Sequence, residues 1–305
     1  MLEATARRAS PILVGALFVG VALPGVAAAL RSLVAPAVVA LLVANMLRID
    51  WRETARPLAS PRRALPLLAW IMLGVPLATA AALHVLPVPP GLAQALLLTA
   101  SSPVLTSVPA FALMLGLDGA LALFAMLATT LLQPLVQPPL LAWLLGIELD
   151  LPIGALMLRL AAFIGGATAI AALIRFAAGA ERLRRRDEAI AGVTVVALVV
   201  FGIGVMDGLT ATLLAEPARV ALFLAVGCAA NFGWQALGAL VFAGAERRAG
   251  LTAALAGGNR NLANIVAVLG PAASPDLLLY LAVGQFPLYV VPALAGPAYR
   301  RLLRR

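Results

Sequence analysis

The chain of 305 residues has no lysine, a single cysteine and a single histidine. The lone cysteine, Cys228, can form no disulfide within the chain, and together with His84 it is too little for a Cys/His metal cluster. A membrane-embedded enzyme would need such a cluster, or a nucleophile with its base. We therefore expect no metal site, no cofactor and no enzymatic activity.

Charged residues are scarce as well. They make up 11% of the chain, whereas 63% of the residues are hydrophobic. In soluble domains about 25% of the residues are charged and about 45–50% are apolar. All the basic residues are arginine, and the net charge is +9. These arginines alternate with apolar runs and form no single face, which excludes nucleic acid as a partner. The composition predicts an all-α integral membrane protein, with one transmembrane domain over 1–305, surrounded by the lipid bilayer.

Long apolar segments fill most of the sequence. About 20 apolar residues cross a hydrocarbon core of ~30 Å as a helix. Charged residues and clusters of proline and glycine divide the chain into ten segments of this size. We predict transmembrane helices over residues 10–29, 32–47, 64–86, 91–116, 119–145, 152–175, 187–207, 217–244, 249–269 and 276–299.

The arginines give the orientation of these spans. If both termini are cytoplasmic, 18 of the 22 arginines lie in inner segments, and only Arg31 and Arg219 lie in outer ones. The other two, Arg159 and Arg260, lie within spans. Cytoplasmic segments of membrane proteins carry such an excess of basic residues. We therefore expect a multi-pass protein of the bacterial inner membrane with both termini in the cytoplasm.

Two of the predicted spans carry residues that interrupt a helix. Ser102-Pro103 and Pro109 lie in the fourth, and Gly257-Gly258 in the ninth. Proline removes a backbone donor and glycine weakens a helix. Irregular backbone persists at membrane depth only where protein or a water-filled cavity satisfies it. Both spans are therefore predicted to be broken.

The two breaks occupy equivalent positions in the two halves of the chain, 10–146 and 152–302. Each is in the fourth span of a five-span half, and an odd number of spans gives the halves opposite orientations. Paired interruptions in inverted repeats indicate the substrate site of a secondary transporter. The alternative is two unrelated kinks.

Three stretches around these breaks follow one another with a distinctive spacing. They are Leu23-Pro24 to Leu30 with Arg31 to Asp50, then Ser102-Pro103 to Asp118 with Thr129-Thr130-Leu131-Leu132-Gln133-Pro134, and then Arg247-Arg248-Ala249-Gly250-Leu251-Thr252. In this order they resemble the bile acid:sodium symporter family over nearly the whole chain.

The resemblance implies a fold and a transport mechanism. In that family a core domain of helices 3–5 and 8–10 crosses its two broken helices near the middle of the membrane. A panel domain of helices 1, 2, 6 and 7 packs against the core. The substrates are bile acids, pantoate, other organic acids or sulfated compounds, usually coupled to sodium. Movement of core against panel alternates access to the site.

The positions of the family's sodium ligands are mostly apolar in this chain. The resemblance places them on Val108 and Pro109, Ala122 and Met126, Leu255, and Ile71, with Asn259 at a family glutamine. Hard cations need several oxygen ligands. We therefore expect that the two sodium sites are absent and that transport is uniport or exchange, without sodium coupling.

Arg260 falls on the position of a family asparagine beside the substrate. A buried arginine at mid-membrane costs at least ~2.5–3.5 kcal/mol on insertion scales. Two hypotheses account for it. Its planar guanidinium binds an anionic substrate, or its fixed charge replaces sodium and bonds the free carbonyls of the broken helices. Both predict a site that favours a small organic anion.

The other candidate substrate-binding residues carry uncharged polar side chains. They are Thr106, Ser107, Asn231, Gln235, Asn259, Asn261, Asn264 and Gln285. For each there is also a structural interpretation. A hydroxyl often bonds back within its own helix, Asn259 and Asn261 could cap the broken ends, and Asn231 and Gln235 could bond between helices.

The leading hypothesis is therefore a secondary transporter of small organic anions that works by alternating access. A membrane receptor or sensor that kept the fold without transport is the main alternative. A sodium-coupled symporter with displaced ligands and a membrane-embedded enzyme are less favoured.

Overall fold

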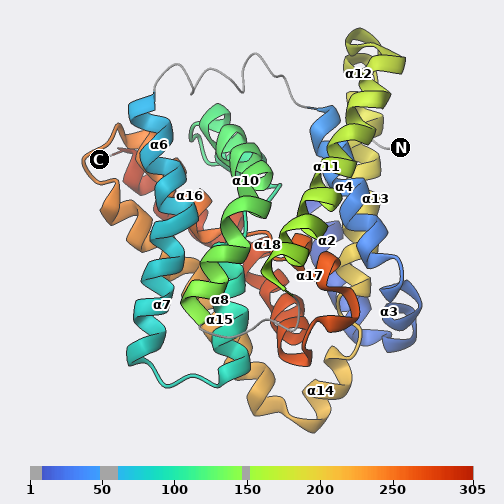
Figure 1. The fold of residues 1–305 in the computed structure, drawn as a ribbon, viewed down its shortest axis with the longest axis vertical. Coiled ribbons are helices and arrows are strands. Elements are labelled where there is room, and N and C mark those ends of the chain that lie inside the picture. The colour runs from blue at the N-terminus through green and yellow to red at the C-terminus, as the bar shows by residue number, and fades with distance from the viewer. Residues whose placement is uncertain (1–8, 49–60, 146–151, 305) are drawn as a thin grey trace.

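The computed structural model describes residues 9–48, 61–145 and 152–304, and these segments are helical with no strand among them (Figure 1). Several predicted features lie outside the described residues. They are the basic N-terminal segment with Arg7 and Arg8, most of the basic segment after the second predicted span with Arg52 and Arg56, and the end of the first predicted repeat at residue 146.

The first half of the chain forms helices close to the predicted spans. They are α2 (Ala9–Ala22), α3 (Pro24–Arg31), α4 (Val34–Leu47), α6 (Pro61–Ala69), the π-helical turn η2 (Trp70–Gly74), α7 (Val75–Val85), α8 (Pro90–Ser101), α9 (Val108–Met114) and α10 (Gly119–Leu145).

The second half follows with a similar series. It contains α11 (Ile153–Ala178), α12 (Ala180–Arg185), α13 (Asp187–Gly204), α14 (Leu209–Ala215), α15 (Pro217–Val241), α16 (Arg247–Gly258), α17 (Ala263–Leu269), the short turn η3 (Gly270–Ala272) and α18 (Pro275–Arg304). The short helices α12 and α14 were not expected from the sequence.

Several helices have the length and composition of membrane spans, which makes the chain a multi-pass membrane protein. Five of the described helical segments qualify, and six do if α2 and α3 count as one bent span. The chain bends by 106° between α2 and α3. Leu23 precedes a proline and takes the non-helical angles φ −124° and ψ 74°. The predicted span 10–29 is therefore not one continuous helix.

The helices form two groups, which meet where α10 packs against α11 and along α17 and α18 (Figure 1). In one group, α13 packs against α2, α3 and α4, and α11 packs against α4. In the other, α15 packs against α16 and α18, α10 against α16, and α7 against α8. The helices α8 and α16, which lead into the two predicted breaks, belong to this second group.

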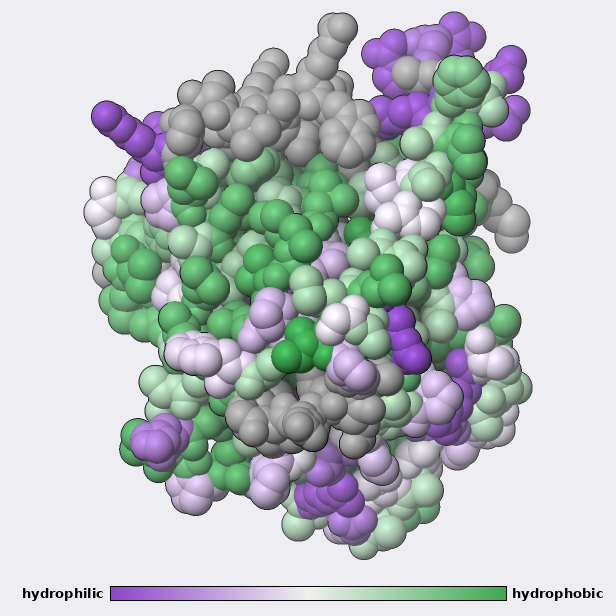
Figure 2. Space-filling view, in the orientation of Figure 1, coloured by the Kyte–Doolittle hydropathy of each residue, from purple (hydrophilic) through white to green (hydrophobic). Residues whose placement is uncertain are grey.

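One end of the molecule carries most of the described arginines. There the Arg48 side chain donates to both Asp187 carboxylate oxygens at 2.7 and 3.0 Å, and Arg247 Nε donates to the Leu302 carbonyl at 2.6 Å. Figure 2 shows strongly polar residues over α12 at this end. Arg184 and Arg185 on α12 hold the pKa of the exposed Glu181 carboxyl below its usual value.

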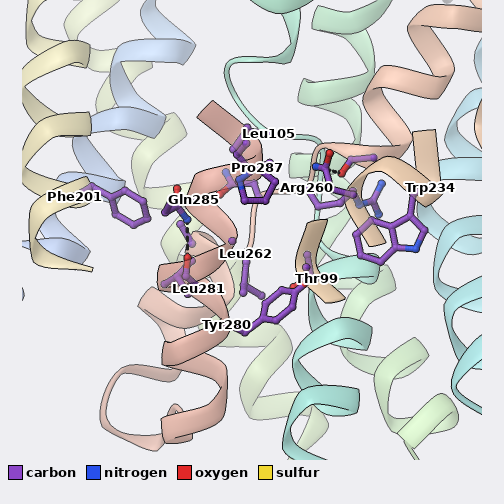
Figure 3. Close-up of a pocket in the computed structure, with 17 residues that line it drawn as sticks. Thr99, Leu105, Phe201, Trp234, Arg260, Leu262, Tyr280, Leu281, Gln285 and Pro287 are labelled. Carbon is purple, nitrogen blue, oxygen red and sulfur yellow. Dashed lines mark hydrogen bonds between the residues drawn. The ribbon is translucent and has the colours of Figure 1, made fainter. Parts of the chain in front are cut away.

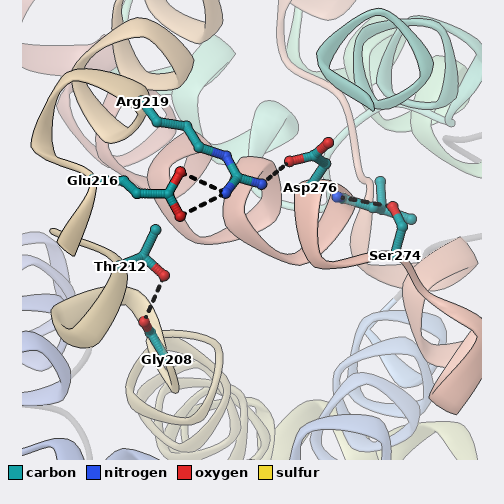
Figure 4. A network of polar contacts seen from close by, with 7 residues as sticks. Gly208, Thr212, Glu216, Arg219, Ser274 and Asp276 are labelled. Atoms are coloured by element: carbon teal, nitrogen blue, oxygen red, sulfur yellow. Dashed lines mark hydrogen bonds and ion pairs between the residues drawn. The ribbon is translucent and has the colours of Figure 1, made fainter. Parts of the chain in front are cut away.

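At the opposite end, the two arginines are paired with acids. Arg219 Nη1 lies 2.9–3.0 Å from the Glu216 carboxylate oxygens, and Nη2 bonds to Asp276 (Figure 4). Arg31 Nη1 lies 2.9 Å from Asp207 Oδ2. The unpaired positive charge of the described residues is therefore concentrated at the end with α12.

Candidate functional site

The helix pairs α8–α9 and α16–α17 are each interrupted by an extended stretch, and the two interruptions meet. The chain is extended between α8 and α9 and between α16 and α17, and Val104 pairs with Arg260 in an antiparallel bridge. The Leu105 N–H donates to the Asn259 carbonyl at 2.9 Å, and the Asn261 N–H donates to the Pro103 carbonyl at 2.8 Å. Backbone N–H and C=O groups that lose their helical partners at one break therefore form hydrogen bonds with those at the other break.

Local sequence explains why each helix stops there. Ser102 precedes Pro103 and takes an extended conformation, with ψ 159°. On the other span, Asn259 is extended, and its Nδ2 atom donates to the Leu255 carbonyl at 2.8 Å. Asn259 thus caps the end of α16, as one of its two interpretations predicted.

Arg260 projects from the crossing into the second group of helices. Its side chain is buried, with 2% of its surface exposed. The Nη2 atom donates to the Ile71 carbonyl at 2.7 Å and to the Ala100 carbonyl. Ala100 is in the last turn of α8, where carbonyl groups have no helical donor. The guanidinium therefore ties the end of α8 to η2.

The Ile71 carbonyl is free because of a local irregularity in its own helix. In the π-helical turn, the Val75 N–H bonds to Trp70 five residues earlier. In that register the Ile71 carbonyl would accept from residue 76, which is proline and has no N–H. The π-helical turn and Pro76 together create the acceptor that Arg260 uses.

The remaining donors of Arg260 are unpaired. Nε and Nη1 are buried and have no hydrogen-bond partner among the described residues. Nη2 belongs to both donor pairs of a guanidinium, Nε with Nη2 and Nη1 with Nη2. Because two backbone carbonyls already accept from Nη2, neither pair of donors is free to form a bidentate hydrogen bond with a carboxylate. The side chain offers single hydrogen bonds and a full positive charge instead.

A small cavity of about 50 Å³ lies beside Arg260 (Figure 3). Its walls come from the crossing and from α13, α15 and α18. Among them Phe201, Trp234, Tyr280 and Leu281 are apolar or aromatic, and the Tyr280 side chain points toward Thr99 in Figure 3. A cavity of this kind needs about 10–15 Å³ to hold one water molecule. The cavity in this conformation therefore has room only for a very small ligand.

A network of amide side chains holds one side of the crossing. Gln137 Nε2 donates to the Leu98 carbonyl at 3.1 Å and to Ser101 and Ser102 hydroxyls, each at 3.2 Å. Gln133 donates to Gln137 at 2.6 Å and accepts from Asn264 at 3.1 Å. This chain of bonds joins α10 to the end of α8 and the start of α17.

A second network holds the other side. Asn231 Nδ2 donates to the Gly258 carbonyl at 2.8 Å and to Asn259 Oδ1 at 3.3 Å. Gln235 donates to Asn231 at 2.8 Å and accepts from the Tyr299 hydroxyl at 2.9 Å. The network joins α15 and α18 to the end of α16, which is the interhelical interpretation of Asn231 and Gln235.

The candidate residues divide into two sets. Arg260, Asn231, Asn261 and Gln285 line the cavity. The described lining does not include Thr106, Ser107, Gln235, Asn259 or Asn264. Among the described residues, the Gln285 side chain donates only to the Leu281 carbonyl in its own helix, at 3.0 Å, and it faces the cavity.

Sequence reasoning missed the aromatic walls of the cavity. Phe201, Trp234 and Tyr280 sit on different helices, and nothing in their spacing brings them together. Trp234 is held by a bond from its Nε1 atom to the Thr79 hydroxyl, at 2.9 Å. Pro76, by contrast, was a visible signal, because a proline inside a span always frees a carbonyl.

Five of the seven positions at which the resemblance would put sodium ligands are buried in the same part of the molecule. Ile71, Val108, Ala122, Met126 and Leu255 all belong to one buried hydrophobic cluster. Each has at most 3% of its surface exposed. Their side chains offer no oxygen, so this part of the crossing is a packed apolar core.

Comparison with known proteins gives no family for the chain. No protein-family model matches the sequence, and a search of curated proteins finds no match.

Proposed function

We propose that the protein is a secondary transporter of small organic anions that works by alternating access without sodium. It spans a bacterial inner membrane ten times with both termini in the cytoplasm. The observation that carries the proposal is Arg260: a buried cation with unpaired donors, beside a cavity where two broken helices cross.

The ten spans follow from counting each broken or bent pair as one. The pairs are α2 with α3, α8 with α9, and α16 with α17. Counting α13 with α14 and adding α4, α6 to α7, α10, α11, α15 and α18 gives ten. The half-helices of the broken pairs are too short to cross alone, since α8 and α16 have 12 residues each.

Helix contacts support an inverted repeat. If the two halves are equivalent, α2 corresponds to α11 and α4 corresponds to α13. The contact of α2 with α13 then corresponds to the contact of α11 with α4, and both contacts exist. In the same way, the contact of α7 with α8 corresponds to that of α15 with α16. The contact of α8 with α18 corresponds to that of α16 with α10. These pairs also exist, and such matched contacts support the proposed repeat.

The lengths of α8 and α16 support a crossing near the middle of the membrane. A helix of 12 residues is about 18 Å long, and the two start from opposite ends of the molecule. Together they match a hydrocarbon core of about 30 Å. Arg260 lies two residues after the end of α16, which supports a mid-membrane position for its side chain.

The cavity favours alternating access over a permanently open path. Phe201 on α13 belongs to the first group of helices, whereas Arg260 and Trp234 belong to the second. Sites for drug-sized ligands have about 300–1,000 Å³, so an organic anion needs more room than the 50 Å³ present. Separation of the two groups at Phe201 would enlarge the cavity.

Flux and binding measurements test the proposal. The purified protein is screened by thermal shift against small monocarboxylates, dicarboxylates, sulfonates and sulfate esters, and each anion that stabilises it is followed as a radiolabel. We expect counterflow into proteoliposomes preloaded with the same anion, at equal rates in sodium and potassium buffers. Binding without flux would instead make the protein a receptor, and no stabilising anion at all would contradict an anion site.

A further inference from the structure

A second and larger cleft lies at the basic end of the molecule, away from the crossing. It has a volume of about 570 Å³, which is in the range of ligand sites. One face of α6 and η2 forms one wall. The end of α15, the turn after it and the start of α16 form the other, with Leu121 of α10 between them.

The cleft is charged at its mouth. Arg62 and Arg63, at the start of α6, are exposed and form no ion pair with a described residue. The Glu246 carboxylate also lines the cleft, but it caps α16 by accepting from the N–H groups of Arg248 and Ala249, at 3.0 and 3.2 Å. The acid is thus engaged with a helix end and forms no ion pair with either arginine.

Deeper in the cleft the walls are apolar. Along α6 and η2, Arg62 to Trp70 spans eight residues, or about 12 Å of helix. At that depth Trp70 packs edge-to-face on Phe242, with ring centroids 6.5 Å apart. Leu67 and Ala253, each 1% exposed, complete this part of the lining.

We infer that this cleft binds an anionic phospholipid of the cytoplasmic leaflet. Its phosphate lies against Arg62 and Arg63, and one acyl chain runs along the accessible wall of Pro66, Ala69 and Trp70. Basic pockets between helices on the cytoplasmic side of membrane proteins suit anionic headgroups. A soluble anion would match the arginines but leave the apolar depth unfilled, whereas a lipid matches both.

The inference needs only the orientation of the chain in the membrane. It does not depend on transport, because the cleft shares no lining residue with the cavity at Arg260. The two proposals can therefore fail separately.

Quenching of Trp70 fluorescence by brominated lipid tests it. A protein with Trp51→Phe, Trp143→Phe and Trp234→Phe keeps Trp70 as its single tryptophan. In nanodiscs, we expect phosphatidylglycerol with brominated acyl chains to quench Trp70 at a mole fraction roughly tenfold lower than the matching phosphatidylcholine. The further pair Arg62→Gln and Arg63→Gln should remove this difference.

The matched control is Arg182→Gln with Arg184→Gln, which removes the same charge from the exposed helix α12 at the same end. This pair should keep the preference for phosphatidylglycerol. Equal quenching by the two lipids, or equal loss of preference in both arginine pairs, would overturn the proposal. So would complete displacement of the lipid by millimolar glycerol 1-phosphate, because the site would then take a soluble anion.

Native mass spectrometry provides a measurement that needs no tryptophan substitution. The protein with all its tryptophans, titrated with phosphatidylglycerol in detergent, should retain one lipid more tightly than it retains phosphatidylcholine. The retained lipid should be lost in Arg62→Gln with Arg63→Gln and kept in the α12 control pair. Retention that is unchanged in the first pair would contradict the site.

Discussion

The Nη2 atom of Arg260 lies 2.7 Å from the carbonyl oxygen of Ile71, and the π-helical turn together with Pro76 leaves this oxygen free. With its second bond, to Ala100, the same nitrogen occupies a carbonyl at the end of α8. These two bonds match the structural role expected of Arg260, in which its guanidinium bonds free carbonyls at the interrupted helices. Nε and Nη1 remain for the second role, contact with an anion.

The first prediction concerns Arg260→Met, which keeps an unbranched side chain of similar reach but removes the charge and donors. The Ile71 and Ala100 carbonyls would lose their partner, at a cost of about 1–3 kcal/mol each. Removing a buried charge offsets about 2.5–3.5 kcal/mol of this. We expect the net effect on stability to lie between a gain of about 1.5 and a loss of about 3.5 kcal/mol, while the thermal shift caused by a bound anion disappears.

Arg260→Lys is the matched variant for that prediction. Lysine keeps the charge as a compact ammonium but lacks the planar spread of donors. We expect anion binding in the order Arg260, then lysine, then methionine, measured by anion-dependent melting. If both variants unfold the protein yet a residual folded fraction still shifts normally with the anion, Arg260 is only structural.

The second prediction concerns the close approach of α15 and α16. A Cβ atom on Gly258 would lie 2.2 Å from Gln235 Cγ and 2.6 Å from the Asn231 carbonyl oxygen. Overpacking of this kind costs about 1–3 kcal/mol. Gly258→Ala should therefore lower the melting temperature and detach the network that runs to Tyr299.

Gly233→Ala is its control. Gly233 is on α15 as well, and a Cβ added there would meet nothing within 4 Å. We expect no loss of stability, because alanine is the better helix former. Equal destabilisation by both substitutions would show that the packing of α15 on the end of α16 is looser than the structure indicates.

The third prediction separates an amide that holds the fold from one that faces the cavity. Gln137→Leu removes bonds to α8 at Leu98, Ser101 and Ser102. Hydrogen bonds between membrane helices average about 0.6 kcal/mol each, so we expect a loss of about 1–2 kcal/mol in denaturant unfolding.

Gln285→Leu should behave in the opposite way. Its only described bond is to Leu281 in the same helix, and it lines the cavity. Stability should stay the same, and anion affinity should fall. Unchanged affinity in Gln285→Leu, measured in the same thermal-shift assay, would remove this residue from the site.

The sequence was sufficient to locate the two breaks, because Ser102-Pro103 and Gly257-Gly258 act on the backbone locally. The sequence also predicted that the charged side chain of Arg260 is buried next to the second break. It could not give the partners of that charge, because the Ile71 carbonyl becomes available only through a change of helical register at η2. Nor could it separate cavity-lining amides from structural ones, since that depends on how α10 and α15 are rotated about their axes.

The last prediction concerns sodium. Ile71, Val108, Ala122, Met126 and Leu255 occupy the space where the resemblance would put two cation sites, and they pack as an apolar cluster. A sodium ion there would lose its hydration without gaining oxygen ligands, and Arg260 would repel it from the crossing. Replacing sodium by potassium at constant ionic strength should leave the melting temperature and anion counterflow unchanged, with choline as the control for general salt effects. A stabilisation specific to sodium would mean that carbonyls at the breaks form a cation site, and the proposed role of the Arg260 charge as its substitute would then be wrong.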